Sequence, residues 1–96
     1  MSCYFIAAID RHDPELYRKY EEGFDAIFAK YAGKVVAVDD HPILLEGAGS
    51  RGRIVLIRFP SVAEARRWYD SPEYQELARY RREASTADIV LVQGRE

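Results

Sequence analysis

The sequence lacks several features that would point to a particular class of protein. It has one cysteine, Cys3, so no internal disulfide can form; this fits a reducing compartment, and we expect a cytoplasmic protein. Fourteen basic side chains against sixteen acidic ones give a net charge of -2, which offers no electrostatic footprint for nucleic acid or an anionic membrane. The N-terminus has no basic segment and only a short apolar run, so we expect neither a signal peptide nor a membrane span.

Histidine is equally scarce. The two histidines, His12 and His41, lie on different segments without metal-ligand spacing, so we expect no metal site. Some dimeric α+β barrels degrade haem, and Trp68 invites that comparison. However, residues 42–96 contain no histidine that could be the axial ligand, so we expect no haem and no other cofactor.

What the chain does have is apolar and aromatic content. With 48% hydrophobic and 12% aromatic residues, its 96 residues predict one globular domain over 1–96. A chain this short buries a modest fraction of its surface, and a partner subunit that covers more of it is expected.

Hydrophobic spacing and capping residues predict the order βαββα(α)β. The expected strands are 3–9, 34–39 with 43–46 as a continuation after a kink at His41-Pro42, 53–59 and 87–93. The first expected helix starts at Asp13-Pro14 and stops at Gly33. The second starts at the capping box Ser61 to Glu64. The third starts at Ser71-Pro72 and runs to about Ala84.

The segment Gly47-Ala48-Gly49-Ser50-Arg51-Gly52 matches the G-x-G-x-x-G fingerprint of dinucleotide-binding proteins. That fingerprint works when the glycine turn opens a helix, whose N-terminus then faces the pyrophosphate. Here a predicted strand, 53–59, follows instead. We therefore interpret Gly47 to Gly52 as a hairpin connection and expect no nucleotide there.

The element order predicts an α+β fold, a ferredoxin-like βαββαβ sandwich with an extra C-terminal helix turn and helices on one sheet face. Strand alternation predicts which side chains face the helices: Cys3, Phe5, Ala7, Ile9, Val55, Ile57 and Phe59. The opposite, open face, with Asp10 and Arg58 at strand ends, is too hydrophobic to leave in water. We therefore expect a homodimer that pairs these faces into a dimeric α+β barrel.

One run of residues also resembles a known family. Residues 57–61 (IRFPS), then Trp68-Tyr69-Asp70-Ser71-Pro72-Glu73-Tyr74, are similar to the bacterial domain of unknown function 1330 family, and the likeness covers nearly the whole chain. It implies a dimeric α+β barrel without an established general activity. Arg58 and Ala8 stand where relatives commonly carry acidic residues, so no carboxylate chemistry is carried over to this chain.

Asp10 and Arg58 are the first candidate catalytic residues. If their strands are parallel neighbours, both stand at C-terminal ends within reach of each other. Arg58 would then hold a carboxylate or oxyanion, with Asp10 orienting it or moving a proton. The alternative is a structural ion pair at the dimer interface. Tyr4 shares their face and is a candidate ligand-binding residue at the opposite end of its strand.

His41 is the third catalytic candidate, because Asp39 shares its side of the strand and can raise its basicity. The alternative is a surface residue at a bulge. Trp68, Tyr69 and Tyr74 are further candidate ligand-binding residues, since aromatic side chains line clefts as readily as they pack cores. The arginine-rich stretch 79–82 is interpreted as a solvated helix face.

Three functions remain open. The first is a cofactor-independent enzyme of isomerase, lyase, cyclase or hydrolase type, acting on a small, partly apolar carbonyl compound; it rests on fold-level analogy. The second is a non-catalytic small-molecule binding or sensing dimer. The third is a structural dimer without a ligand.

Overall fold

The structure, a computed structural model, describes residues 1–49 and 52–95. Its elements follow the chain as β1 (Cys3–Arg11), α1 (Pro14–Phe28), β2 (Lys34–Asp39), β3 (Arg53–Phe59), α2 (Val62–Tyr69), α3 (Pro72–Ala84) and β4 (Ser85–Gln93). The predicted extra helical segment is α3, a full helix of 13 residues. None of the helices in the described ranges is long and apolar enough to cross a membrane.

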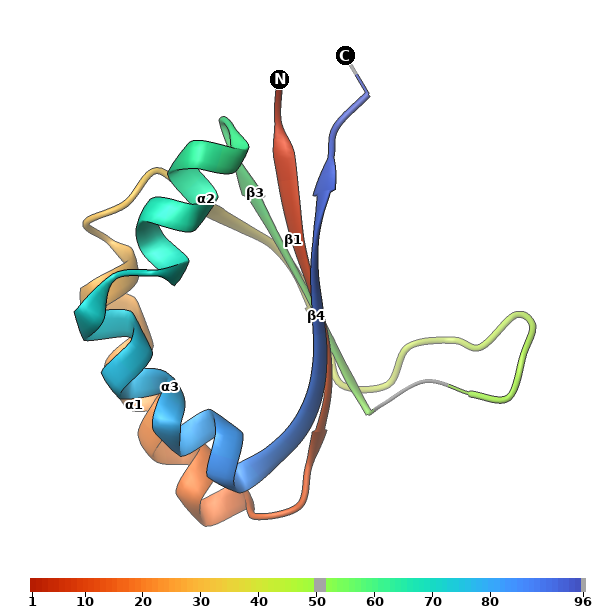
Figure 1. Ribbon diagram of the computed structural model, residues 1–96. Helices are drawn as coiled ribbons and strands as arrows, with labels where there is room; N and C mark the ends of the chain where they lie inside the picture. Colours follow the sequence, from red (N-terminus) through yellow and green to blue (C-terminus); the bar gives the residue numbers. More distant parts are fainter. Residues whose placement is uncertain (50–51, 96) are drawn as a thin grey trace.

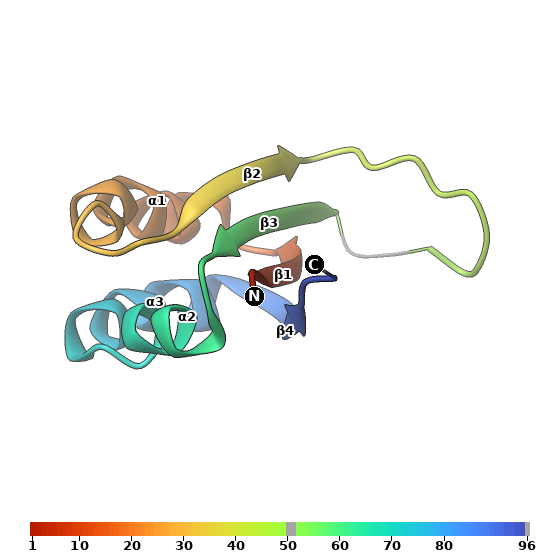
Figure 2. The ribbon, with the colours of Figure 1, turned by 90° about the horizontal axis from the view of Figure 1, so that it is seen from above.

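The strands form one sheet in the order β2-β3-β1-β4, in which every neighbouring pair is antiparallel. All the helices lie on one face of this sheet, α1 on the β2 side and α2 with α3 on the β4 side (Figures 1 and 2). The predicted α+β, ferredoxin-like sandwich is confirmed.

Side-chain alternation along β1 and β3 sorts the two faces as predicted. On the helix side, Cys3, Phe5, Ala7 and Ile9 are buried, as are Ile57 and Phe59. These side chains pack around Trp68, which is fully buried and stacks on Phe59 with ring centroids 5.5 Å apart. The opposite face of the sheet is bare in a single chain (Figure 1).

The predicted capping residues start the helices. Oδ1 of Asp13 accepts a hydrogen bond from the Leu16 main-chain N–H at 3.1 Å, and Oγ of Ser61 accepts one from the Glu64 N–H at 3.2 Å. The return half of the capping box does not form, because the Glu64 carboxylate accepts a hydrogen bond from Arg67 instead. Ser71 caps α3 in the same way.

Several predicted boundaries were wrong: β1 continues to Arg11, and β4 begins at Ser85. Helix α1 ends at Phe28 rather than at Gly33, and Gly33 serves packing instead: a Cβ there would lie 2.5 Å from the Phe59 ring. Residues 43–46 form no strand, because β2 ends at Asp39 and the chain then projects away from the sheet (Figure 2). We call residues 42–49 the arm. Ser50 and Arg51, within the predicted hairpin connection, lie outside the described residues.

Candidate functional site

A cavity of about 350 Å³ lies between the sheet and α1. Its floor is apolar and is built from the helix side of all four strands, with Ala7, Val55 and Ile89 among the lining residues. Tyr17, Tyr20 and Phe24 of α1 and Arg81 of α3 complete the walls. The volume falls within the range of about 300–1,000 Å³ that is typical of small-molecule sites.

Tyr20 and the buried cation Arg81 are polar residues of the wall, and Tyr74 lies behind Tyr20. The hydroxyls of Tyr20 and Tyr74 are hydrogen-bonded at 2.8 Å, and the guanidinium carbon of Arg81 lies 5.9 Å from the centroid of the Tyr20 ring. Burial, together with the neighbouring Tyr74, raises the pKa of Tyr20 well above its ordinary value, so its hydroxyl stays protonated.

Arg81 is unusual because it is only 5% exposed and yet forms no ion pair with a described carboxylate. Its Nε finds no acceptor among the residues that the structure describes. Burial opposes the charged form, but interactions with Tyr74 and Tyr20 outweigh it and raise the pKa of Arg81. A buried guanidinium without a counter-charge is costly, so this position favours an anionic ligand.

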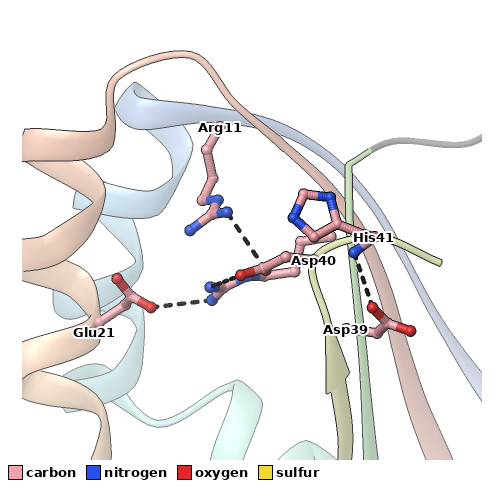
Figure 3. A network of polar contacts seen from close by, with 6 residues as sticks. Arg11, Glu21, Asp39, Asp40 and His41 are labelled. Carbon is pink, nitrogen blue, oxygen red and sulfur yellow. Dashed lines mark hydrogen bonds and ion pairs between the residues drawn. The ribbon is translucent and has the colours of Figure 1, made fainter.

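A network of paired charges contributes Arg53 and Glu21 to the lining of the cavity (Figure 3). Nε of Arg53 donates to Oδ1 of Asp40 at 2.6 Å, while Nη1 of Arg53 donates to Oε2 of Glu21 at 3.0 Å. Arg11 adds a further ion pair to Asp40 at 3.4 Å. The Arg53 hydrogen bond holds the pKa of Asp40 below its ordinary value. The positive charge of Arg53 is thus compensated by the two carboxylates, whereas that of Arg81 faces no described counter-charge.

The expectation that Asp10 and Arg58 meet was wrong. Because β1 and β3 are antiparallel rather than parallel, the residue opposite Arg58 is Tyr4, and the residue opposite Asp10, on β4, is Thr86. Asp10 and Arg58 therefore stand at opposite ends of the open face. Arg58 donates instead to the Ser2 hydroxyl, from Nη2 at 3.0 Å.

His41 lies in the exposed connection after β2, and Asp39 does not meet its imidazole. The Asp39 carboxylate accepts the hydrogen bond of the His41 main-chain N–H at 2.8 Å (Figure 3). This contact fixes the turn, and the predicted arrangement of the two side chains for general-base catalysis is absent.

The predicted aromatic candidates Trp68, Tyr69 and Tyr74 do come together, with 4.3 Å between the ring centroids of Trp68 and Tyr74. None of the three lines the 350 Å³ cavity; Tyr74 touches it only through Tyr20. Tyr69 lines a separate, smaller cavity of about 240 Å³.

The sequence-based prediction assigned Arg81 to a solvated helix face, whereas the structure buries it at the cavity wall. A signal was present, because Arg81 lies seven residues after Tyr74 and three after Ala78, spacings that share one helix face, and both of these residues are buried. An arginine within an apolar stripe is a better indicator of a site than an arginine within a run of arginines.

The comparisons with known proteins fit this architecture. The family described as Domain of unknown function (DUF1330) matches residues 2–95. The chain belongs to the DUF1330 family. No curated protein matches it in sequence.

Solved structures share the fold of this DUF1330 protein at low identity. A protein of unknown function from Rhodopseudomonas palustris has a TM-score of 0.78 at 18% identity, over 99% of this chain and 83% of its own. SnoaB, a cofactor-independent oxygenase from Streptomyces nogalater, has a TM-score of 0.67 at 20% identity, over 99% and 94%. A dimeric ferredoxin-like protein of unknown function from Thermobifida fusca has a TM-score of 0.65 at 15% identity, over 96% and 90%.

Proposed function

We propose that this DUF1330 protein is a cofactor-independent enzyme that acts on a small, partly apolar carbonyl compound bound in the cavity between α1 and the sheet. The observation that carries the proposal is Arg81, a buried cation that forms no ion pair with a described carboxylate, in the wall of a cavity with a largely apolar floor. The fold is shared with SnoaB, described as a cofactor-independent oxygenase, which supports a scaffold able to host such chemistry.

The ligand class follows from the lining. Apolar floor residues from every strand accept a hydrocarbon or aryl part, while Arg81 stabilises a carboxylate, or the oxyanion that forms when a carbonyl compound enolises. The Tyr20 hydroxyl, kept protonated by its raised pKa, lies beside the same position. An acid with a carbonyl group and an apolar tail satisfies all these groups.

Two carboxylates, Glu21 and Asp25, lie at the cavity wall on α1. Glu21 is held by Arg53, whereas Asp25 forms no ion pair with a described residue. In the proposed step, Asp25 takes a proton from the carbon next to the carbonyl, and the C–H electron pair moves to give an enolate stabilised by Arg81. Return of the proton to another position completes an isomerisation.

A non-catalytic binding or sensing role is the second candidate. The Arg53 network favours this role, because it already engages the carboxylates of Glu21 and Asp40. Among the described residues, Asp25 is then the single carboxylate at the wall that is available for proton transfer, and an enzyme that needs a second such group would lack it.

The experiment combines binding with proton exchange. Phenylpyruvate and 2-oxooctanoate are titrated into the protein by calorimetry, and loss of their C3 protons in D₂O is followed by NMR. Binding with exchange above the buffer rate supports the enzyme, whereas binding without exchange supports the sensor. Absence of binding by both compounds would contradict the assigned ligand class.

Variants locate the site. Arg81→Met is expected to weaken binding about ten- to a hundredfold, because a hydrogen bond to a charged group contributes about 1.5–3 kcal/mol. Arg79→Met is the matched control, since Arg79 lies on the same helix, is largely exposed and pairs with Glu76. Asp25→Asn is expected to abolish exchange while leaving binding intact. Equal effects of the Arg81 and Arg79 changes on binding would contradict the assignment of the cavity as the binding site.

We also infer that two copies pair through their open sheet faces. The middle of this face is apolar and includes Ile6, Leu56 and Val90, of which Val90 is 54% exposed. One end carries Asp10, Asp39 and Asp88, and the other carries Lys34 and Arg58. A second copy with reversed strand direction places acidic ends over basic ends.

Related folds described as dimeric support this pairing. Light scattering at micromolar concentration is expected to give about twice the 11.1 kDa chain mass. A monomer at that concentration would contradict the pairing.

A further inference from the structure

The arm carries apolar side chains that the described residues leave exposed. Ile43 is 86% exposed, Leu44 54% and Leu45 89%. Side chains two residues apart in an extended segment share one side, so Ile43 and Leu45 together present an apolar surface. The arm has the composition of a strand, which explains why the sequence predicted one here. No described strand lies beside the arm to pair with it.

The edge strand β2 also exposes apolar side chains. β2 is an edge strand, and its valines Val35, Val36 and Val38 are 39%, 51% and 51% exposed. No described strand pairs with the outer edge of β2, so another extended segment can add there. The arm cannot return to its own β2, because it leaves that strand and projects beyond the sheet (Figure 2).

The direction of the arm indicates which molecule covers it. The helices lie on one side of the sheet and the arm projects on the other, the side of the open face (Figure 1). A second copy stacked on this face, with reversed strand direction, brings its β2 edge alongside the arm. The apolar surface of the arm thus continues the interface assigned to the homodimer.

We propose that Ile43 and Leu45 of one copy dock on the exposed valines of β2 in the second copy, an inference that rests on the proposed homodimer. The consequence concerns the cavity, because Val35 and Val38 also line it. Docking there places side chains of the partner beside the cavity, so that each site is completed by both copies.

Disulfide trapping tests the contact directly. Ile43→Cys and Val36→Cys proteins are mixed and oxidised, and a cross-link between the two chains is expected. The native Cys3 is fully buried, and burial raises the pKa of its thiol, so it stays unreactive. Ile43→Cys mixed with Val62→Cys is the control, since Val62 is 40% exposed on α2, away from the open face. Equal trapping in both mixtures, or none, would overturn the docking.

A second measurement separates this inference from the homodimer itself. Ile43→Ser/Leu45→Ser is expected to weaken dimerisation roughly tenfold or more in analytical ultracentrifugation, since two apolar side chains return to water. Val62→Ser is expected to leave it unchanged. An arm variant that dimerises like the unmodified protein contradicts the docking alone, whereas a monomeric unmodified protein contradicts the homodimer and the docking together.

Discussion

The hydroxyls of Tyr20, on α1, and Tyr74, on α3, share a buried hydrogen bond of 2.8 Å. The two residues are 54 positions apart in the chain, and their contact fixes the two helices against each other beside Arg81. The ring centroids are 6.2 Å apart in an edge-on arrangement, so packing and hydrogen bonding act together at this point.

Removing one hydroxyl of this pair is expected to destabilise the protein. Tyr20→Phe leaves the Tyr74 hydroxyl buried without its partner, at a cost of about 1–3 kcal/mol. Tyr20→Phe/Tyr74→Phe removes both hydroxyls and is expected to cost less than the sum of the single changes. Urea unfolding measures all three variants, with Tyr80→Phe as a control because Tyr80 is 40% exposed. Strict additivity would show that the hydrogen bond contributes nothing.

Gly33→Ala tests the close approach of the loop after α1 to the core. The new Cβ would lie 2.5 Å from the ring of Phe59, which is fully buried, so a cost of about 1–3 kcal/mol is expected from overpacking. Gly23→Ala is the control, because its Cβ would meet only the flexible end of Leu77, and alanine favours the helix. Thermal unfolding of both variants checks this, and an unchanged Gly33→Ala protein would disprove the close contact.

The stability of the fold is expected to depend on pH through Asp40. Its pKa is lowered in the folded state, chiefly by the hydrogen bond from Arg53, so the folded protein binds fewer protons at this carboxyl than the unfolded chain does. The stabilisation is therefore complete above the unfolded pKa and is lost as pH falls through the folded value. The difference in unfolding free energy between the unmodified protein and Asp40→Asn should shrink from pH 6 to pH 3. A constant difference over that range would argue against the ion pair.

The glycine segment Gly47 to Gly52 is expected to bind no nucleotide. The element that follows it is β3 rather than a helix, so the segment does not open a helix whose N-terminus could hold a pyrophosphate. NAD or ATP at millimolar concentration should leave the melting temperature unchanged. Stabilisation by several degrees would mean that the folded state binds the nucleotide, contrary to this prediction.

Much of the fold follows from neighbours along the chain. The alternation Cys3, Phe5, Ala7, Ile9 identified the buried face of β1, because a strand turns successive side chains to opposite sides. Asp13 and Ser71 located helix starts, because a capping side chain acts on N–H groups only three residues away.

The candidate site depends on contacts that no local pattern contains. Whether Arg58 faces Asp10 or Tyr4 is decided by the direction in which β3 pairs with β1, and the antiparallel pairing selected Tyr4. Arg81 resembles its exposed neighbour Arg79 in sequence, and only the packing of α1 against α3 encloses it beside Tyr20. The sequence by itself determined the four strands of the sheet, the starts of the helices and the buried faces of β1 and β3, because those properties arise within a few residues. The tertiary structure alone decided which charges meet and which one is buried without a counter-charge among the described residues, because those depend on segments far apart in the chain.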